Sequence, residues 1–299
     1  MKHIKSSFSD DLAKKIIGNT ENASKYLMEL KKQTCNHSIK TYMISRGKNA
    51  GSEALDLTSK EIWKTIVDTW EYEIGKTIIR SLFVETEKYK NGKEAVNAID
   101  ILIKEWEKLK LGDIAWPFSQ GAFDEFVQRV NSEKSNGYEK DTKVKIAAVK
   151  YRRIKEINTV RNDFIETLIF EKNENILPTL NHRRGVDFFI NGISFDQKVA
   201  KSPTNEFKRY YGENWKQVAV VQPELVAKYL YTYQDEGRFG ADPRLLVVYL
   251  DEDVSIEKIK NTIDSANLYE PIEVTFTYKH KTTGEKNYKV ACFVILLHN

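Results

Sequence analysis

One short stretch, GVDFFINGISFDQKVAK at residues 185–201, constrains the fold of this chain more than any other. Two apolar runs flank Asn191-Gly192, and this dipeptide is the strongest short signal for a two-residue hairpin turn of type I′. A two-residue turn fixes which residues lie opposite each other in the two strands. The sequence therefore predicts an antiparallel hairpin with Asp187 directly opposite Asp196.

The predicted hairpin has one apolar and one polar face, because side chains alternate across a strand. The apolar face consists of Phe188, Ile190, Ile193, Phe195 and Val199. The other face carries Asp187, Asp196 and Lys198, together with Phe189 and Ser194. Two carboxylates directly across a sheet repel each other, so this arrangement is destabilising unless something compensates their charge.

A divalent cation bound by Asp187 and Asp196 is one such compensation. Carboxylate oxygens suit magnesium, which proteins commonly hold with one or two carboxylates together with water and substrate phosphates. Lys198 would then lie beside the cation on the same strand face. A plain salt-bridge ladder, in which Lys198 neutralises both aspartates, explains the same residues, and this alternative stays open.

The segments GVD at 185–187 and DQK at 196–198 resemble the motif of the PD-(D/E)xK nuclease superfamily, the fold class that contains type II restriction endonucleases. The resemblance extends from the helix that ends near residue 172 to the strand near residue 250. It implies that Asp187 and Asp196 are catalytic carboxylates that hold magnesium. It also implies that Lys198 is the catalytic lysine, which positions or activates the attacking water.

Two more residues follow from the resemblance alone. The backbone carbonyl of Gln197 would complete the metal shell, and the family often has a glutamate on the helix before the first motif strand. Residues 143–172 contain no Gly or Pro and carry apolar residues at helical spacing. Glu166 is the expected catalytic glutamate there and Glu171 the alternative, although solvated helix charges explain both. Val186 stands where the name of the motif has proline.

Composition places the chain among soluble globular proteins, with 41% hydrophobic and 30% charged residues. Its 47 Lys and Arg against 43 Asp and Glu leave a net charge of +4, too mild to indicate nucleic-acid binding by itself. The two cysteines, Cys35 and Cys292, exclude a disulfide scaffold and a cysteine zinc cluster, and they fit a reducing cytoplasm. No apolar run or signal peptide predicts a membrane segment, so a cytoplasmic location is expected.

Other common chemistries find no support in the sequence. The five histidines show no spacing typical of catalytic zinc. No G-x-x-x-x-G-K-[ST] motif occurs, so no nucleotide cofactor is expected.

The sequence pattern of the first part of the chain predicts helices. They are expected over residues 12–18, capped by Ser9-Asp10-Asp11, over 59–83, with a capping box of Thr58 and Glu61, over 93–110 and over 121–130. The polar stretch 131–142 contains Asn-Gly and is the predicted linker. The sequence thus predicts a mainly helical domain at 1–135 and a nuclease domain at 143–299.

The second part mixes strands and helices. After the long helix and the hairpin, a helix-like stretch at 204–217, a helix at 223–233, a strand at 244–251, a helix at 255–266 and a closing hairpin at 272–297 are expected. This order predicts an α/β (α+β) fold, a restriction-endonuclease-like mixed central sheet flanked by helices.

Basic residues after the motif predict contacts with DNA phosphates. Lys201, Lys208, Arg209 and Lys216 follow the motif lysine, with tyrosines between them, and phosphate contacts need such side chains. Arg238 and Arg244, around a glycine-containing loop, are expected to reach phosphates or guanine edges. An ordinary basic surface helix and a tight loop explain these two segments as well.

The favoured hypothesis is a magnesium-dependent DNA endonuclease, of the type II restriction class, that cuts a short specific double-stranded sequence. A homodimer is expected if the site is a palindrome, because two-fold dimers read palindromic sites. A repair, transposition or antiviral nuclease of the same fold is the nearest alternative. A catalytically inactive DNA-binding or interaction protein is the alternative from another class.

Overall fold

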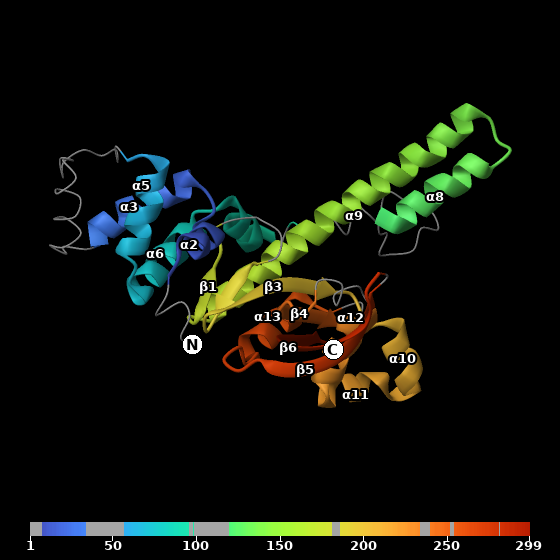
Figure 1. Ribbon diagram of the computed structural model, residues 1–299. Coiled ribbons are helices and arrows are strands. Elements are labelled where there is room, and N and C mark those ends of the chain that lie inside the picture. Colours follow the sequence, from blue (N-terminus) through green and yellow to red (C-terminus); the bar gives the residue numbers. More distant parts are fainter. Residues whose placement is uncertain are drawn as a thin grey trace. The chain divides into compact units, whose positions relative to one another are not determined.

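The computed structural model describes residues 8–33, 57–95, 98, 120–180, 186–233, 240–251, 254–280 and 282–299 (Figure 1). The chain forms two compact units: Met1–Thr86 together with Leu168–Asn299, and Glu87–Thr167. These bounds differ from those of the predicted domains 1–135 and 143–299, because the first helices pack against the sheet that follows them in sequence. The predicted domain boundary itself stays a prediction.

The first unit begins with four labelled helices. They are α2 (Asp10–Ile17), α3 (Thr20–Gln33), α5 (Ser59–Asp68) and α6 (Tyr72–Val84). The predicted caps are confirmed. The Ser9 side chain accepts from the Leu12 amide, and the Thr58 amide donates to Glu61 Oε2 at 2.8 Å, as a capping box requires.

The prediction of a single helix over 59–83 is wrong, because the helix is interrupted between Asp68 and Tyr72. Trp70 lies in this interruption and therefore does not belong to the apolar stripe of α5. Its ring stacks on Phe8 with ring centroids 3.7 Å apart. Periodicity favours one continuous helix here, whereas the aromatic contact with the start of the chain favours two shorter ones.

The second unit contains a long helical hairpin. It comprises α8 (Gln120–Ser132) and the first part of α9 (Gly137–Lys172), and the ring of Phe123 on α8 stacks on that of Tyr151 on α9. The helix predicted over 143–172 is thereby confirmed and begins earlier. The linker predicted at 131–142 is wrong: only a short turn separates the two helices, and the remainder of the polar stretch is helical.

The helix predicted over 93–110 lies largely outside the described residues. Residues 87–95 are helical and belong to the second unit.

A six-stranded mixed sheet forms the centre of the first unit. Its strands are β1 (Ile176–Pro178), β2 (Phe188–Ile190), β3 (Ile193–Ala200), β4 (Arg244–Tyr249), β5 (Ile272–His280) and β6 (Gly284–Leu297), in the spatial order β1-β2-β3-β4-β6-β5. Strands β3, β4 and β6 are parallel, and the outer pairs are antiparallel. The predicted mixed α/β class is therefore confirmed, whereas β1 was missed because three residues carry too little periodicity.

The predicted hairpin register is confirmed over the whole of β2. Phe188 pairs with Phe195, and the two strands meet at Asn191 and Gly192, whose φ angles are 51° and 86°. Two positive φ angles are what a type I′ turn requires, and they explain the Asn-Gly pair.

Five further helical segments connect the later strands. They are α10 (Asn205–Tyr211), the 3₁₀ turn η1 (Gly212–Asn214), α11 (Trp215–Val221), α12 (Pro223–Tyr233) and α13 (Ile256–Ser265). The helix-like stretch predicted at 204–217 is thus two short helices around η1. Helix α12 packs on β5 and β6, and its residues share a core with Ala200, Leu246 and Val248 of β3 and β4.

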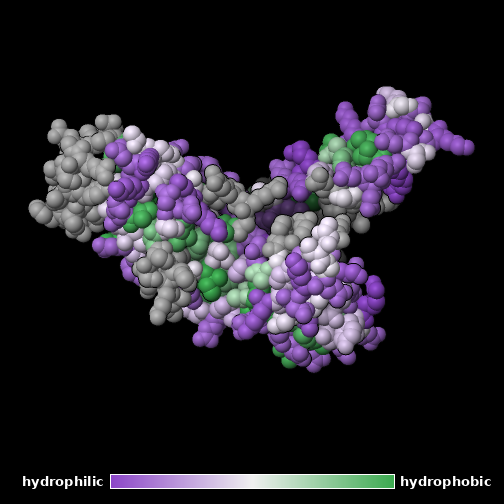
Figure 2. Space-filling view, in the orientation of Figure 1, coloured by the Kyte–Doolittle hydropathy of each residue, from purple (hydrophilic) through white to green (hydrophobic). Residues whose placement is uncertain are grey.

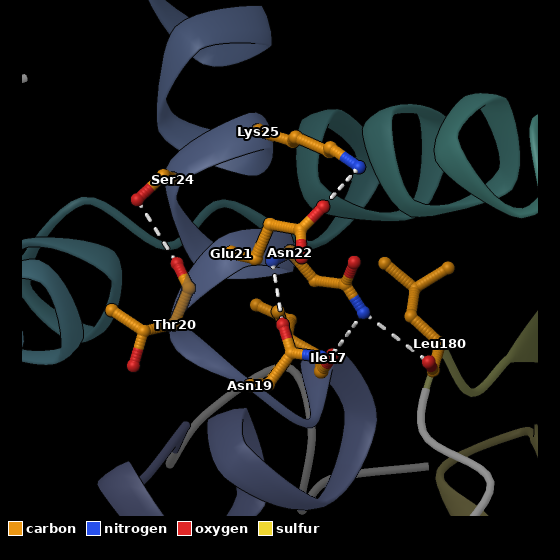
Figure 3. A network of polar contacts seen from close by, with 8 residues as sticks. All are labelled: Ile17, Asn19, Thr20, Glu21, Asn22, Ser24, Lys25 and Leu180. Carbon is orange, nitrogen blue, oxygen red and sulfur yellow. Dashed lines mark hydrogen bonds and ion pairs between the residues drawn. The ribbon is translucent and has the colours of Figure 1, made fainter. Parts of the chain in front are cut away.

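Main-chain and side-chain bonds tie the first helices to the sheet. The Leu180 amide donates to Ile16 O at 2.7 Å, and Asn22 Nδ2 donates to the carbonyls of Ile17 and Leu180 (Figure 3). Arg80 of α6 donates to the Ile176 carbonyl at 2.6 Å and to two carbonyls at the end of α9. Arg80 therefore serves as a C-terminal cap for α9 and links it to β1.

The visible surface is mostly hydrophilic, broken by small apolar patches (Figure 2). Among the described residues, no helix combines the length and apolar character needed to cross a membrane.

Candidate functional site

Asp187 lies one residue before β2, where the hairpin ladder ends. Its amide donates to Phe195 O at 2.9 Å, although Phe195 is already the partner of Phe188. Two consecutive residues therefore face one residue of β3, which is the pattern of a β-bulge. The prediction that Asp187 lies directly opposite Asp196 is thus corrected: the bulge shifts Asp187 away from simple cross-strand pairing.

The Asp187 carboxylate continues the ladder in place of main chain. Its Oδ2 accepts from the Gln197 amide at 2.8 Å. Because the amide and carbonyl of one strand residue lie on the same edge, the Gln197 carbonyl also lies on the edge that faces Asp187. The structure therefore brings together the predicted ligands Asp187 and Gln197.

Asp196 lies inside β3 and is held by β4. Its amide donates to Pro243 O at 3.2 Å, and its carboxylate forms an ion pair with Arg244, its partner in the parallel register. The Asp196 side chain is 24% exposed and that of Arg244 only 8%. This ion pair therefore lies mostly out of water, and Arg244 directly neutralises Asp196.

Arg244 also interacts with Asp187. Burial lowers the pKa of the Arg244 guanidinium, and the negative charge of Asp187 opposes that change. An arginine stays protonated in spite of such shifts, so both carboxylates lie near one buried cation. The prediction that Arg244 reaches phosphates or guanine edges is not what the structure shows, since its side chain is turned to Asp196.

Lys198 completes the group on β3. It lies two residues after Asp196 on the same strand face and is partly buried. Ala200, next on that face, is buried in the core with α12. Polar side chains and apolar core thus follow each other along one face of β3.

The two candidate glutamates lie on α9, in different units. Glu166 is buried in the second unit, where it forms an ion pair with Lys88. Glu171 is partly buried near the end of the helix, in the first unit. Within the part of the chain that the structure describes, no group of three or more His, Cys, Asp or Glu side chains could hold a metal ion. The catalytic role of Glu166 stays a prediction.

The predicted DNA-binding residues have different surroundings. The Nζ atom of Lys201 is buried, whereas Arg209 is exposed on α10. Lys208 Nζ lies 4.9 Å from the ring centroid of Trp215. Arg238 lies outside the described residues.

A cluster of aromatic rings connects α10 and α12, and the sequence patterns gave it no role. Its members are Phe207, Tyr210 and Tyr211 of α10 and Tyr229 and Tyr233 of α12. Tyr210 is 74% exposed. The i, i+4 spacing of Tyr229 and Tyr233 predicts that both lie on one face of a helix. The sequence does not predict that this face contacts α10.

The donor set around Asp187 and Asp196 fits a magnesium ion. Two carboxylates and a strand carbonyl supply the hard oxygens that magnesium prefers. The two carboxylates already share a positive charge, that of Arg244. This place therefore accommodates a positive charge, and a magnesium ion there would compete with Arg244 for Asp196.

Comparison of the chain with protein-family models, curated proteins and solved structures finds no match.

Proposed function

We propose that this protein is a magnesium-dependent DNA endonuclease that hydrolyses phosphodiester bonds. One observation carries the proposal: Asp187 and Asp196, the latter in the middle of β3, lie near the positive charge of Arg244, with Lys198 two residues after Asp196 on the same strand. The nuclease motif that the sequence resembles has these residue types at these positions. The mixed α/β fold is compatible with that superfamily.

The residues would divide the work as follows. Asp187, Asp196 and the Gln197 carbonyl would hold magnesium, which supplies a Lewis acid for the phosphate and lowers the pKa of a bound water. Lys198 would orient the attacking water or stabilise the developing negative charge. The bond from the Gln197 amide to Asp187 would keep that carboxylate from rotating away.

The proposed substrate is double-stranded DNA. Exposed Arg209 and the neighbouring Lys208 could contact phosphates, and the exposed ring of Tyr210 lies beside them in sequence. A type II restriction enzyme that acts as a homodimer on a palindromic site is the specific form of the proposal.

The test is cleavage of unmethylated phage and plasmid DNA with magnesium and with chelator. The wild type and the exposed control variant Lys260→Ala of α13 should give the same discrete fragments with magnesium. The variant Lys198→Ala should reduce the rate by at least about a hundredfold, as the loss of a catalytic group does. Equal cleavage by Lys198→Ala, or cleavage in chelator, would refute the proposed mechanism.

The Arg244–Asp196 ion pair favours a second candidate, a nucleic-acid-binding or interaction protein without catalysis. In such a protein Arg244 and Lys198 would neutralise the aspartates permanently, and no metal would be needed. Thermal unfolding separates the candidates, because only a metal site predicts that magnesium raises the Tm of the wild type and not that of Asp187→Asn.

A further inference from the structure

Arg244 lies beside Asp196 and pairs with it. It is the first residue of β4, and the parallel register fixes its Cα beside that of Asp196. Its side chain is 8% exposed. The guanidinium therefore has an ion-pair partner but little access to solvent.

Charge balance explains why a buried arginine is present. Asp187 and Asp196 bring two negative charges to the middle of β3, and unpaired carboxylates are costly when partly buried. Arg244 pairs with Asp196 directly and interacts with Asp187 through space. If a divalent cation binds only part of the time, the two carboxylates need another positive charge while the cation is absent.

We propose that Arg244 is a positioning residue that serves as the internal counter-ion of the candidate site: it pairs with Asp196 when no divalent cation is bound and releases Asp196 when magnesium binds. This inference rests on the proposed function and deepens it. The backbone of β4 is fixed in the sheet, so the exchange needs only rotation of the arginine side chain.

The exchange makes the two cations competitors for one carboxylate. A guanidinium and a magnesium ion near the same oxygens repel each other, and this repulsion is strong away from bulk water. Binding of magnesium and pairing of Arg244 are therefore negatively coupled. It follows that removing the guanidinium should tighten magnesium binding, although it leaves the apo protein less stable.

Magnesium binding by calorimetry, without DNA, tests this inference. We expect Arg244→Met to bind magnesium about tenfold more tightly than the wild type, the size of a modest coupling between two sites. Arg152→Met, an exposed arginine of α9, is the matched control and should bind like the wild type. Arg244→Gln, which keeps a hydrogen-bond donor but no charge, should also bind more tightly and serves if the methionine variant does not fold.

The stability of the same proteins gives a second readout. In chelator, Arg244→Met should unfold at a lower temperature than the wild type, and magnesium should raise its Tm by more than that of the wild type. Equal magnesium affinities of wild type and both Arg244 variants would overturn the inference and leave the proposed function intact. Absence of magnesium binding in every variant would overturn both.

Discussion

Asp187 lies at the start of a hairpin, whereas Asp196 lies where that hairpin meets a strand from another part of the chain. The carboxylate of Asp187 is fixed by the Gln197 amide, a neighbour within the same hairpin. The carboxylate of Asp196 is fixed by Arg244, which reaches it only because β3 and β4 are parallel partners. Local structure therefore builds the Asp187 half of the candidate site, and long-range strand pairing builds the Asp196 half.

The largest effect is expected where the long-range half is broken. Asp196→Ala leaves Arg244 without its partner and should lower the free energy of unfolding by about 2–4 kcal/mol, since breaking a buried ion pair is costly. The 24% exposure of the Asp196 side chain keeps the value below that of a fully buried pair. Urea unfolding in chelator measures it.

A cross-strand ion pair at the surface provides the control. Lys289 and Glu273, each 64% exposed, pair between β6 and β5, and Glu273→Ala should cost less than about 1 kcal/mol. The double variant Asp196→Ala, Arg244→Met should be less destabilised than the sum of the single variants. Additive losses would mean that the two residues do not stabilise each other.

A second prediction tests long-range packing in the other unit. A Cβ added to buried, helical Gly92 would lie 2.0 Å from Thr167 Oγ1 and 2.6 Å from the Asp163 carbonyl. Helix propensity alone predicts that Gly92→Ala stabilises by about 1 kcal/mol. Because of the close approach to α9, we expect it instead to destabilise by about 1–3 kcal/mol.

Gly137→Ala is the matched variant for this prediction. Gly137 begins α9, and nothing described lies within 4 Å of an added Cβ. Thermal unfolding should show no loss of stability for Gly137→Ala. A stabilising effect of Gly92→Ala would show that local propensity, rather than the contact with α9, decides at this position.

The smallest effect is expected in the local half of the site. Asp187→Ala removes the acceptor of the Gln197 amide and should cost about 1–2 kcal/mol in chelator. Asp187→Asn keeps an oxygen acceptor, so its loss of stability should be smaller. Hydrogen exchange of the Gln197 amide should be faster in the alanine variant only; equal exchange rates in both variants would argue against a role of this bond.

Sequence patterns were reliable where neighbouring residues decide the structure. The Asn-Gly turn, the register of β2 and β3, and the caps at Ser9 and Thr58 were predicted because each depends on a few adjacent residues. The break before Trp70 was not, because the ring contacts Phe8, far away in sequence. The bulge at Asp187 was missed as well, since an alternating pattern assumes an unbroken ladder.

The sequence by itself determined the mixed α/β class, the hairpin and the presence of Asp187, Asp196 and Lys198 on one short segment. Only the tertiary structure decided that Arg244 neutralises Asp196 and that Glu166 pairs with Lys88. The physical reason is that an ion pair requires two side chains to be close in space. The order of strands β3, β4 and β6, which brings them together, cannot be predicted from the spacing of residues along the chain.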